Sequence, residues 1–123
     1  MNQAVLGVGL DVCDVNRIAK LRKKSAFIYE IMSPTEAAAP PRSDEEIAFL
    51  WATKEAVAKS LGIGFWQKNL AFSDITVGPT GDIALTGAAA LHAGAVTFNI
   101  DRWRQDNHVV VKCVRLRAVR GRL

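Results

Sequence analysis

Three residues that could act on a substrate lie four positions apart near the middle of the chain: Trp51, Glu55 and Lys59. Residues at this spacing share one face of a helix, so an acid and a base stand beside an aromatic ring. A Glu–Lys pair at this spacing is often an ordinary surface ion pair worth roughly 0.2–0.5 kcal/mol. Here the neighbours are small or apolar, and a segment with Gly62 and Gly64 follows. The face therefore also suits a metal ion and a phosphate, because magnesium takes carboxylate and phosphate oxygens and lysine pairs with phosphate.

A second acidic residue, Asp11, ends an apolar run over residues 4–12 that predicts a buried strand. Burying a carboxylate costs free energy unless the group gains a partner. Asp11 therefore either accepts hydrogen bonds at the start of the next helix or binds a metal ion. Gly7 and Gly9 in the same run leave room for a close backbone or a ligand.

Basic residues form two clusters in a chain of net charge +4. Such clusters attract nucleic acids, nucleotide phosphates, membranes or acidic proteins, and a solvated face with a basic tail explains them equally well. The first cluster is Arg17, Lys20, Arg22, Lys23 and Lys24, and the second lies at the C-terminal tail, which begins at about residue 117: Arg115, Arg117, Arg120 and Arg122.

Length and composition exclude several classes of protein. The 123 residues suffice for one domain with one core, and half of them are hydrophobic. No apolar run approaches the roughly 20 residues that span a bilayer, and the first residues lack the pattern of a signal peptide. Two cysteines, Cys13 and Cys113, are too few for a disulfide framework or a four-ligand zinc site. We expect a cytoplasmic protein.

The elements that must position these residues alternate between strand and helix signals. Asp14 is a candidate helix cap, Ser33 and Glu36 form a capping box, and Ser43 with Glu46 forms another. The predicted order is β-α-α-α-β-β-α-β-β, an α+β domain in which a long central helix packs on a small, mostly antiparallel sheet. We expect strands at 4–12, 72–77, 82–86, 96–100 and 108–116, helices at 15–24, from 33 to about 39, at 43–61 and at 87–94, and loops at 62–69 and 78–81.

Two motifs together are recognisable. The segment 7–12 (GVGLDV), followed by Arg17, resembles the opening GxGxD segment of holo-acyl-carrier-protein synthases, within the 4'-phosphopantetheinyl transferase superfamily. The segment 51–62 (WATKEAVAKSLG) resembles the family's central (F/W)xxKEAxxKxxG motif, and 72–77 with its glycine-containing turn resembles the next hairpin. The resemblance extends over about residues 5–116.

The resemblance implies a coenzyme site and a reaction. Asp11 and Glu55 would bind magnesium, or manganese, together with the pyrophosphate of coenzyme A. Lys59 would contact the phosphate, with Lys54 and Gly62 as further coenzyme contacts. A carrier serine would attack the β-phosphorus, and adenosine 3',5'-bisphosphate would leave. Glu55 would take the serine proton, either directly or through a metal-bound water. Catalysis of this kind is mostly positioning and neutralisation of charge.

The resemblance also implies partners. The cluster of Arg17, Lys20, Arg22, Lys23 and Lys24 would bind the acidic helix of an acyl carrier protein, of fatty-acid, polyketide or peptide synthesis. Small members are trimers with the coenzyme between subunits, which predicts about 40 kDa, three times the 13.4 kDa chain. The strand 108–116 offers Val109, Val111, Cys113 and Leu116 either to such an interface or to the chain's own core.

One segment departs from the family, which carries Ser-x-Ser/Thr-His after the fourth strand. Here residues 98–103 read FNIDRW, so we expect Arg102, or failing that Arg104, to bind a coenzyme phosphate, with Asn99 supplying a lesser contact. The alternative is a non-catalytic relative that binds coenzyme A or a carrier protein. A small nucleic-acid-binding protein is a third hypothesis, but the basic clusters contain no stacking aromatics.

Overall fold

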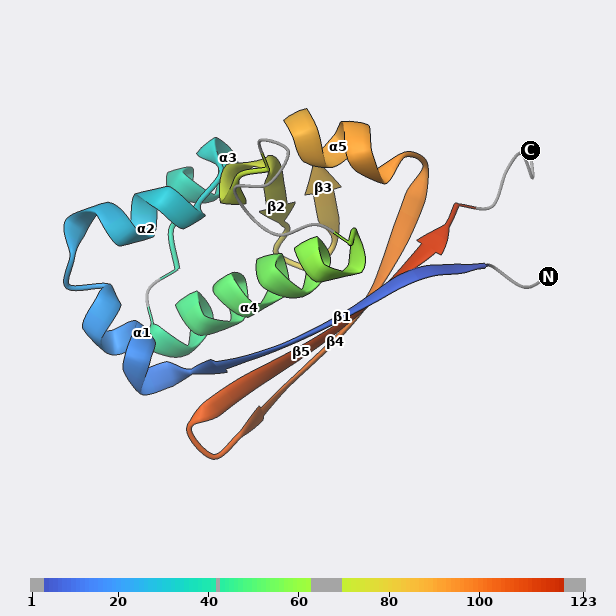
Figure 1. Ribbon diagram of the computed structural model, residues 1–123. Coiled ribbons are helices and arrows are strands. Elements are labelled where there is room, and N and C mark those ends of the chain that lie inside the picture. The colour runs from blue at the N-terminus through green and yellow to red at the C-terminus, as the bar shows by residue number, and fades with distance from the viewer. Residues whose placement is uncertain (1–3, 42, 63–69, 119–123) are drawn as a thin grey trace.

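Figure 1 shows the computed structural model of the chain, which describes residues 4–41, 43–62 and 70–118. Within these ranges four helices follow the first strand, and two hairpins separated by a short helix come after them. In order the elements are β1 (Val5–Asp14), α1 (Val15–Leu21), α2 (Ser25–Ile31), α3 (Pro34–Ala38), α4 (Asp44–Ser60), the 3-10 helix η1 (Phe72–Asp74), β2 (Ile75–Val77), β3 (Ile83–Leu85), α5 (Gly87–Ala93), β4 (Val96–Gln105) and β5 (His108–Arg117).

Two antiparallel sheets lie on either side of α4. The larger has the strand order β1-β5-β4, and the smaller is the β2–β3 hairpin. The long helix α4 lies across one face of the larger sheet, and α2, α3, α5 and the small hairpin lie beyond α4 (Figure 1). This arrangement confirms the predicted α+β fold with a long central helix on an antiparallel sheet.

Small residues let α4 pack directly on β1. Gly7 and Gly9 face the helix, and a Cβ atom on either would overlap the carbonyl of Ser60 or Ala56. On the helix, Ala52 and Ala56 are fully buried. Both glycines therefore leave room for a close backbone, which is one of the two uses that the sequence allows for them.

Three helix starts are capped as predicted. Asp14 accepts from the backbone N–H of Asn16 at 2.8 Å, and Ser33 and Glu36 form a complete capping box. The Ser43 hydroxyl oxygen accepts from the backbone N–H of Glu46 at 3.0 Å. The Glu46 carboxylate accepts from the same hydroxyl at 3.1 Å, so this second capping box is incomplete.

The structure departs from the expected elements in three places, the first being the strand expected at 72–77, where residues 72–74 form η1 and only 75–77 form a strand. Helix α1 ends at Leu21, and a separate helix, α2, follows it, so one helix was missed. The ring of Phe27 on α2 stacks 5.5 Å from that of Trp51 on α4. This tertiary contact has no signal in local sequence. Strand β4 extends to Gln105, five residues beyond its predicted end, because it pairs along the whole of β5. Of the expected loop 62–69, residues 63–69 lie outside the described part of the chain, as does the tail from 119.

The two faces of the larger sheet differ. Val109, Val111 and Cys113 face α4 and are fully buried, so they belong to the core and not to an association surface. Of the four residues considered for self-association, Leu116 faces the other way, because side chains alternate along a strand. On this outer face β1 exposes Val5, Val8, Leu10 and Val12, each more than half accessible to solvent.

Candidate active site

The carboxylate of Asp11 meets the ammonium group of Lys59 between β1 and α4. Lys59 Nζ donates to Asp11 Oδ1 at 3.0 Å and to the carbonyl of Leu10 at 2.9 Å. Asp11 faces α4 because it lies two residues beyond Gly9, which touches the helix. Glu55 lies one turn before Lys59 on the same helix face. The structure thus brings together two acidic residues and a lysine from two distant parts of the sequence.

Burial disfavours the charged forms of both acids, and repulsion from Asp11 adds to this effect at Glu55. Burial raises the pKa of Asp11, while Lys59 and Arg17 oppose the shift. Burial and the negative charge of Asp11 raise the pKa of Glu55, again against Lys59 and Arg17. Glu55 therefore senses the charge of Asp11, and the positive charge of Arg17 on α1 acts on both acids.

The cluster fits a divalent cation. Asp11 Oδ2 is buried and has no hydrogen-bond partner, so one carboxylate oxygen is left for another ligand. A nearby cation would give Asp11 Oδ2 a partner and would offset the repulsion that Asp11 exerts on Glu55. Among residues 4–41, 43–62 and 70–118 no group of three or more acidic, histidine or cysteine residues could hold a metal ion. Magnesium typically takes one or two protein carboxylates and completes its shell with water and substrate phosphate oxygens.

The carboxyl end of α4 is held near this cluster by residues that the motifs do not include. Arg115 Nε donates to the carbonyl of Ser60 at 2.8 Å. His92 Nε2 lies 3.0 Å from the carbonyl of Leu61 and donates to it in the tautomer that carries a hydrogen on Nε2. Gly62 follows with a φ of 77°, which favours glycine and ends the helix. Arg115 belongs to β5 rather than to a solvated tail.

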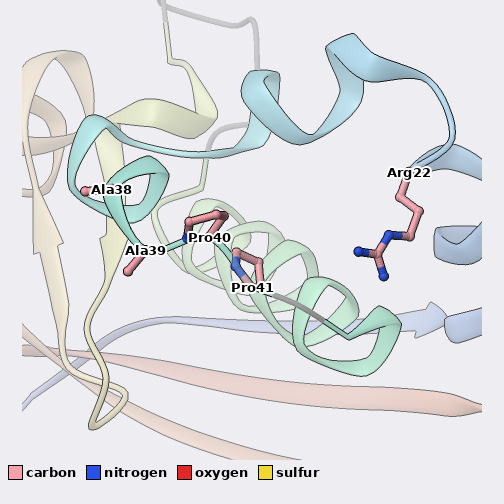
Figure 2. A pocket seen from close by; sticks show the side chains of 5 residues that line it. All are labelled: Arg22, Ala38, Ala39, Pro40 and Pro41. Carbon is pink, nitrogen blue, oxygen red and sulfur yellow. The ribbon is translucent and has the colours of Figure 1, made fainter.

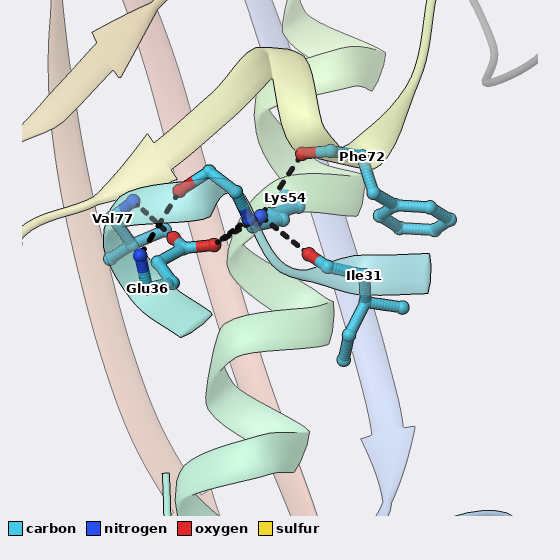
Figure 3. A network of polar contacts seen from close by, with 6 residues as sticks. Ile31, Glu36, Lys54, Phe72 and Val77 are labelled. Carbon is cyan, nitrogen blue, oxygen red and sulfur yellow. Dashed lines mark hydrogen bonds and ion pairs between the residues drawn. The ribbon is translucent and has the colours of Figure 1, made fainter. Parts of the chain in front are cut away.

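Lys54 does not lie with its neighbour Glu55. Its side chain is fully buried on another face of α4, where Nζ donates to the carbonyls of Ile31 and Phe72 and to Glu36 Oε1 (Figure 3). The second Glu36 oxygen accepts from the N–H of Val77 at 2.7 Å. An ammonium group has three donors, and all three are used here. The expectation that Lys54 contacts a coenzyme phosphate is therefore wrong for this structure, since the lysine joins α4 to the α3 and β2 region instead.

Four of the five predicted carrier-binding residues are exposed at the surface. Arg17 and Lys20 lie on α1, and Lys23 and Lys24 follow it. Arg22 differs, because its guanidinium lies 2.7 Å from the carboxylate of Asp44 at the start of α4.

An open pocket of about 600 Å³ lies beside Arg22, apart from the acidic cluster. Arg22 lies on one side of it and the loop after α3 on the other (Figure 2). Apart from Arg22 it is lined by Ala38, Ala39, Pro40 and Pro41.

Comparison with known families decides the classification. Residues 7–113 match the sequence profile of the 4'-phosphopantetheinyl transferase superfamily. The chain belongs to this superfamily. Both motifs that carry Asp11, Glu55 and Lys59 lie within the matched region.

Curated relatives in this superfamily are holo-[acyl-carrier-protein] synthases. The chain is 39% identical over 95 residues to the synthase of Solidesulfovibrio magneticus, covering 75% of each chain. It is 34% identical over 108 residues to that of Hydrogenovibrio crunogenus, covering 80% of this chain and 83% of the relative. A solved structure of the Bacillus anthracis synthase in complex with coenzyme A (3',5'-ADP) is similar in fold, with a TM-score of 0.74 at 23% identity, covering 95% of this chain and 100% of that one.

Residues 98–103, which the sequence led us to expect as a departure from the family, do not bring Asn99 and Arg102 onto one face of the sheet. Arg102 pairs with Val111 and faces α4, where its guanidinium carbon lies 5.4 Å from the centre of the Phe49 ring. Asn99 lies three residues earlier on the same strand and is directed to the opposite face. Val111 on β5 pairs with Asp11 of β1 on one side and with Arg102 of β4 on the other, so β5 separates Arg102 from Asp11. Within one chain Asn99 and Arg102 thus lie on opposite faces of the sheet, and their binding of a coenzyme phosphate stays a prediction.

Proposed function

We propose that this chain is a holo-acyl-carrier-protein synthase that transfers 4'-phosphopantetheine from coenzyme A to a serine of an acyl carrier protein. The meeting of Asp11, Glu55 and Lys59 in one partly buried cluster carries the proposal. The three residues lie on the two motifs shared with the superfamily, and the curated relatives named above are all synthases of this kind.

The reaction forms a bond between the serine oxygen and the β-phosphorus of coenzyme A. The bond to adenosine 3',5'-bisphosphate breaks, and that group leaves with its electron pair. Asp11 and Glu55 would hold magnesium or manganese, which neutralises phosphate charge when bound. Lys59 is half exposed, so its ammonium group can move from Asp11 to a phosphate oxygen, where it stabilises the charge that develops.

Glu55 is the proposed acceptor of the serine proton. A general base works best when its pKa lies near the working pH, and burial together with Asp11 raises the pKa of Glu55 in that direction. The positive charge of Arg17 opposes the rise in the pKa of both acids, so it favours their ionised forms.

The exposed residues Arg17, Lys20, Lys23 and Lys24 are the proposed surface for an acidic helix of the carrier protein. Charges at the rim of an interface act mainly on the association rate and on salt sensitivity. The same face lies next to the acidic cluster through Arg17, so a bound carrier would present its serine close to Glu55.

We further propose a homotrimer. The outer face of the larger sheet supports self-association, because Val5, Val8, Leu10 and Val12 on β1 and Trp103 on β4 are large hydrophobic residues left exposed there. In a trimer, Arg102 or Asn99 of a neighbouring subunit could complete the coenzyme site that one chain leaves open. A cytoplasmic location stays a prediction of the sequence. In the described part of the chain no helix is long and apolar enough to cross a membrane.

The test is transfer itself. The chain is incubated with an apo acyl carrier protein, coenzyme A and magnesium, and the carrier is weighed by intact mass spectrometry. The carrier should gain one phosphopantetheine group, and a carrier with its acceptor serine changed to alanine should gain nothing. Binding of coenzyme A or of the carrier without any mass gain would favour a non-catalytic relative.

A further inference from the structure

The tip of the β4–β5 hairpin lies beside the first turns of two helices (Figure 1). Arg104 organises it, since its Nε donates to the carbonyl of Asp106 at 2.9 Å and its Nη1 to Glu45 Oε1 at 3.0 Å. Glu45 lies in the first turn of α4. Nη2 lies 3.4 Å from Asn107 Oδ1. The Arg104 guanidinium is therefore engaged within the chain, which argues against its use as a phosphate contact.

Asn107 connects this tip to the start of α1. Its backbone carbonyl accepts from the N–H of Val15, the first residue of the helix, at 2.9 Å. Its side-chain Nδ2 donates to Asp14 Oδ1 at 3.0 Å, the same oxygen that caps the helix by accepting from Asn16. The Asn107 amide thus uses its oxygen toward Arg104 and its nitrogen toward Asp14.

Helix α1 depends on such outside contacts for its position. It has seven residues, and isolated helices of this length are not stable in water. Val15 and Ile18 anchor its inner side in the core. At its far end Arg22 pairs with Asp44. At its near end the bonds from Asn107 fix where the helix begins and in which direction it leaves β1.

The direction of α1 decides where Arg17 stands. Arg17 lies in the first turn of the helix and acts on the charges of both Asp11 and Glu55. Lys20 lies three residues further along the same helix. A small rotation of α1 would move both cations relative to the acidic cluster and to any acidic helix bound at this surface.

We propose that Asn107 is a positioning residue for the carrier protein: the hairpin tip holds helix α1 so that Arg17 and Lys20 meet the acidic partner in register with the acidic cluster. The inference rests on the proposed function, in which α1 binds the carrier. It gives the tip of the β4–β5 hairpin a role in placing α1.

The first experiment compares Asn107→Ala with wild type and with the matched control Gln105→Ala. Gln105 is exposed on the same hairpin, and its side chain takes no part in the bonds described above. Losing the side-chain bond to Asp14 should raise the KM for the carrier about 2- to 10-fold, as expected for one hydrogen bond. The KM for coenzyme A should stay at the wild-type value, and Gln105→Ala should change neither. Equal rises in both constants, or no rise for the carrier, would overturn the inference.

A reciprocal exchange separates positioning from a general loss of stability. Asn107→Asp alone puts two carboxylates together and should impair carrier use more than Asn107→Ala. Combining it with Asp14→Asn restores one donor and one acceptor, and asparagine caps a helix as well as aspartate does. The combined variant should therefore recover most of the carrier KM. A combined variant as poor as Asn107→Asp alone would count against a positioning role.

Carrier binding without coenzyme A distinguishes this inference from the proposed function. Absence of transfer by the wild-type chain would overturn the proposed function. Calorimetric titration with the apo carrier then still decides the inference, since Asn107→Ala should bind about 2- to 10-fold more weakly than wild type. Equal affinities, or no binding by the wild-type chain, would overturn it.

Discussion

Replacement of Lys54 by methionine should strongly destabilise the chain. The side chains of Lys54 and Glu36 are 0% and 7% exposed and form an ion pair of 2.6 Å. Methionine keeps the apolar stem of the lysine but leaves the Glu36 carboxylate buried without its cation. The carbonyls of Ile31 and Phe72 lose a donor as well. Burial already lowers the pKa of Lys54, and Glu36 opposes that shift, so the charged lysine depends on its partner.

The expected loss follows from the geometry of the pair. Removing one partner of a buried ion pair typically costs about 3–5 kcal/mol. For a chain of 123 residues this loss corresponds to a fall in Tm of roughly 10–20 °C. Urea unfolding and thermal unfolding measure the two quantities. Lys23→Met is the matched control, because Lys23 is exposed, and it should change stability by less than about 0.5 kcal/mol.

A second variant tests whether the pair acts as a unit. Once Lys54→Met is in place, adding Glu36→Gln removes the unpaired charge and should recover part of the lost stability. A loss below about 1 kcal/mol for Lys54→Met would refute the structural role, because that is the range of an exposed pair. A stable Lys54→Met chain with weakened coenzyme A binding would instead restore the original expectation that Lys54 contacts a phosphate.

Three further predictions follow from the cluster and the surfaces beside it. Because the pKa of Glu55 is raised in the fold, the chain loses stability as the pH rises from 4.5, the ordinary pKa of glutamate, through the raised pKa. Glu55→Gln should therefore stabilise the chain at neutral pH but not below pH 4.5. Urea unfolding at the two pH values measures this, and an equal effect of the variant at both would contradict it. Arg17→Glu should raise the KM for the carrier far more than that for coenzyme A, and a matching rise for both would remove Arg17 from the carrier surface. Leu10→Glu on the outer sheet face should yield a monomer of 13.4 kDa in light scattering, whereas wild type should form a trimer. A trimeric variant would place the interface elsewhere, and a monomeric wild type would refute the trimer.

Local signals in the sequence were sufficient for the frame of the fold. Asp14, Ser33 and Ser43 each mark a helix start because their side chains accept a backbone N–H that the helix leaves unpaired. Gly7 and Gly9 mark a close approach because any side chain would collide with α4. The spacing of Glu55 and Lys59 places both on one helix face, and it holds wherever the helix packs.

Features that depend on distant partners were not predictable. Lys54 and Glu55 are adjacent in the motif, yet the helix turns about 100° between them, so one enters the core and the other reaches the acidic cluster. Only the position of Glu36 decides which. The length of β4 is set by its pairing with β5, and the role of Arg104 by Glu45, 59 positions away in the sequence.

Transfer by this chain is tested most directly by the intact mass of an acyl carrier protein after incubation with coenzyme A, magnesium and either the wild-type chain or Glu55→Gln. We expect a gain of one phosphopantetheine group with wild type. With Glu55→Gln we expect almost no gain, while calorimetry still shows carrier binding because the surface of α1 is unchanged. No gain with wild type would contradict the transferase, and an equal gain with both would contradict the assignment of Glu55 to the reaction.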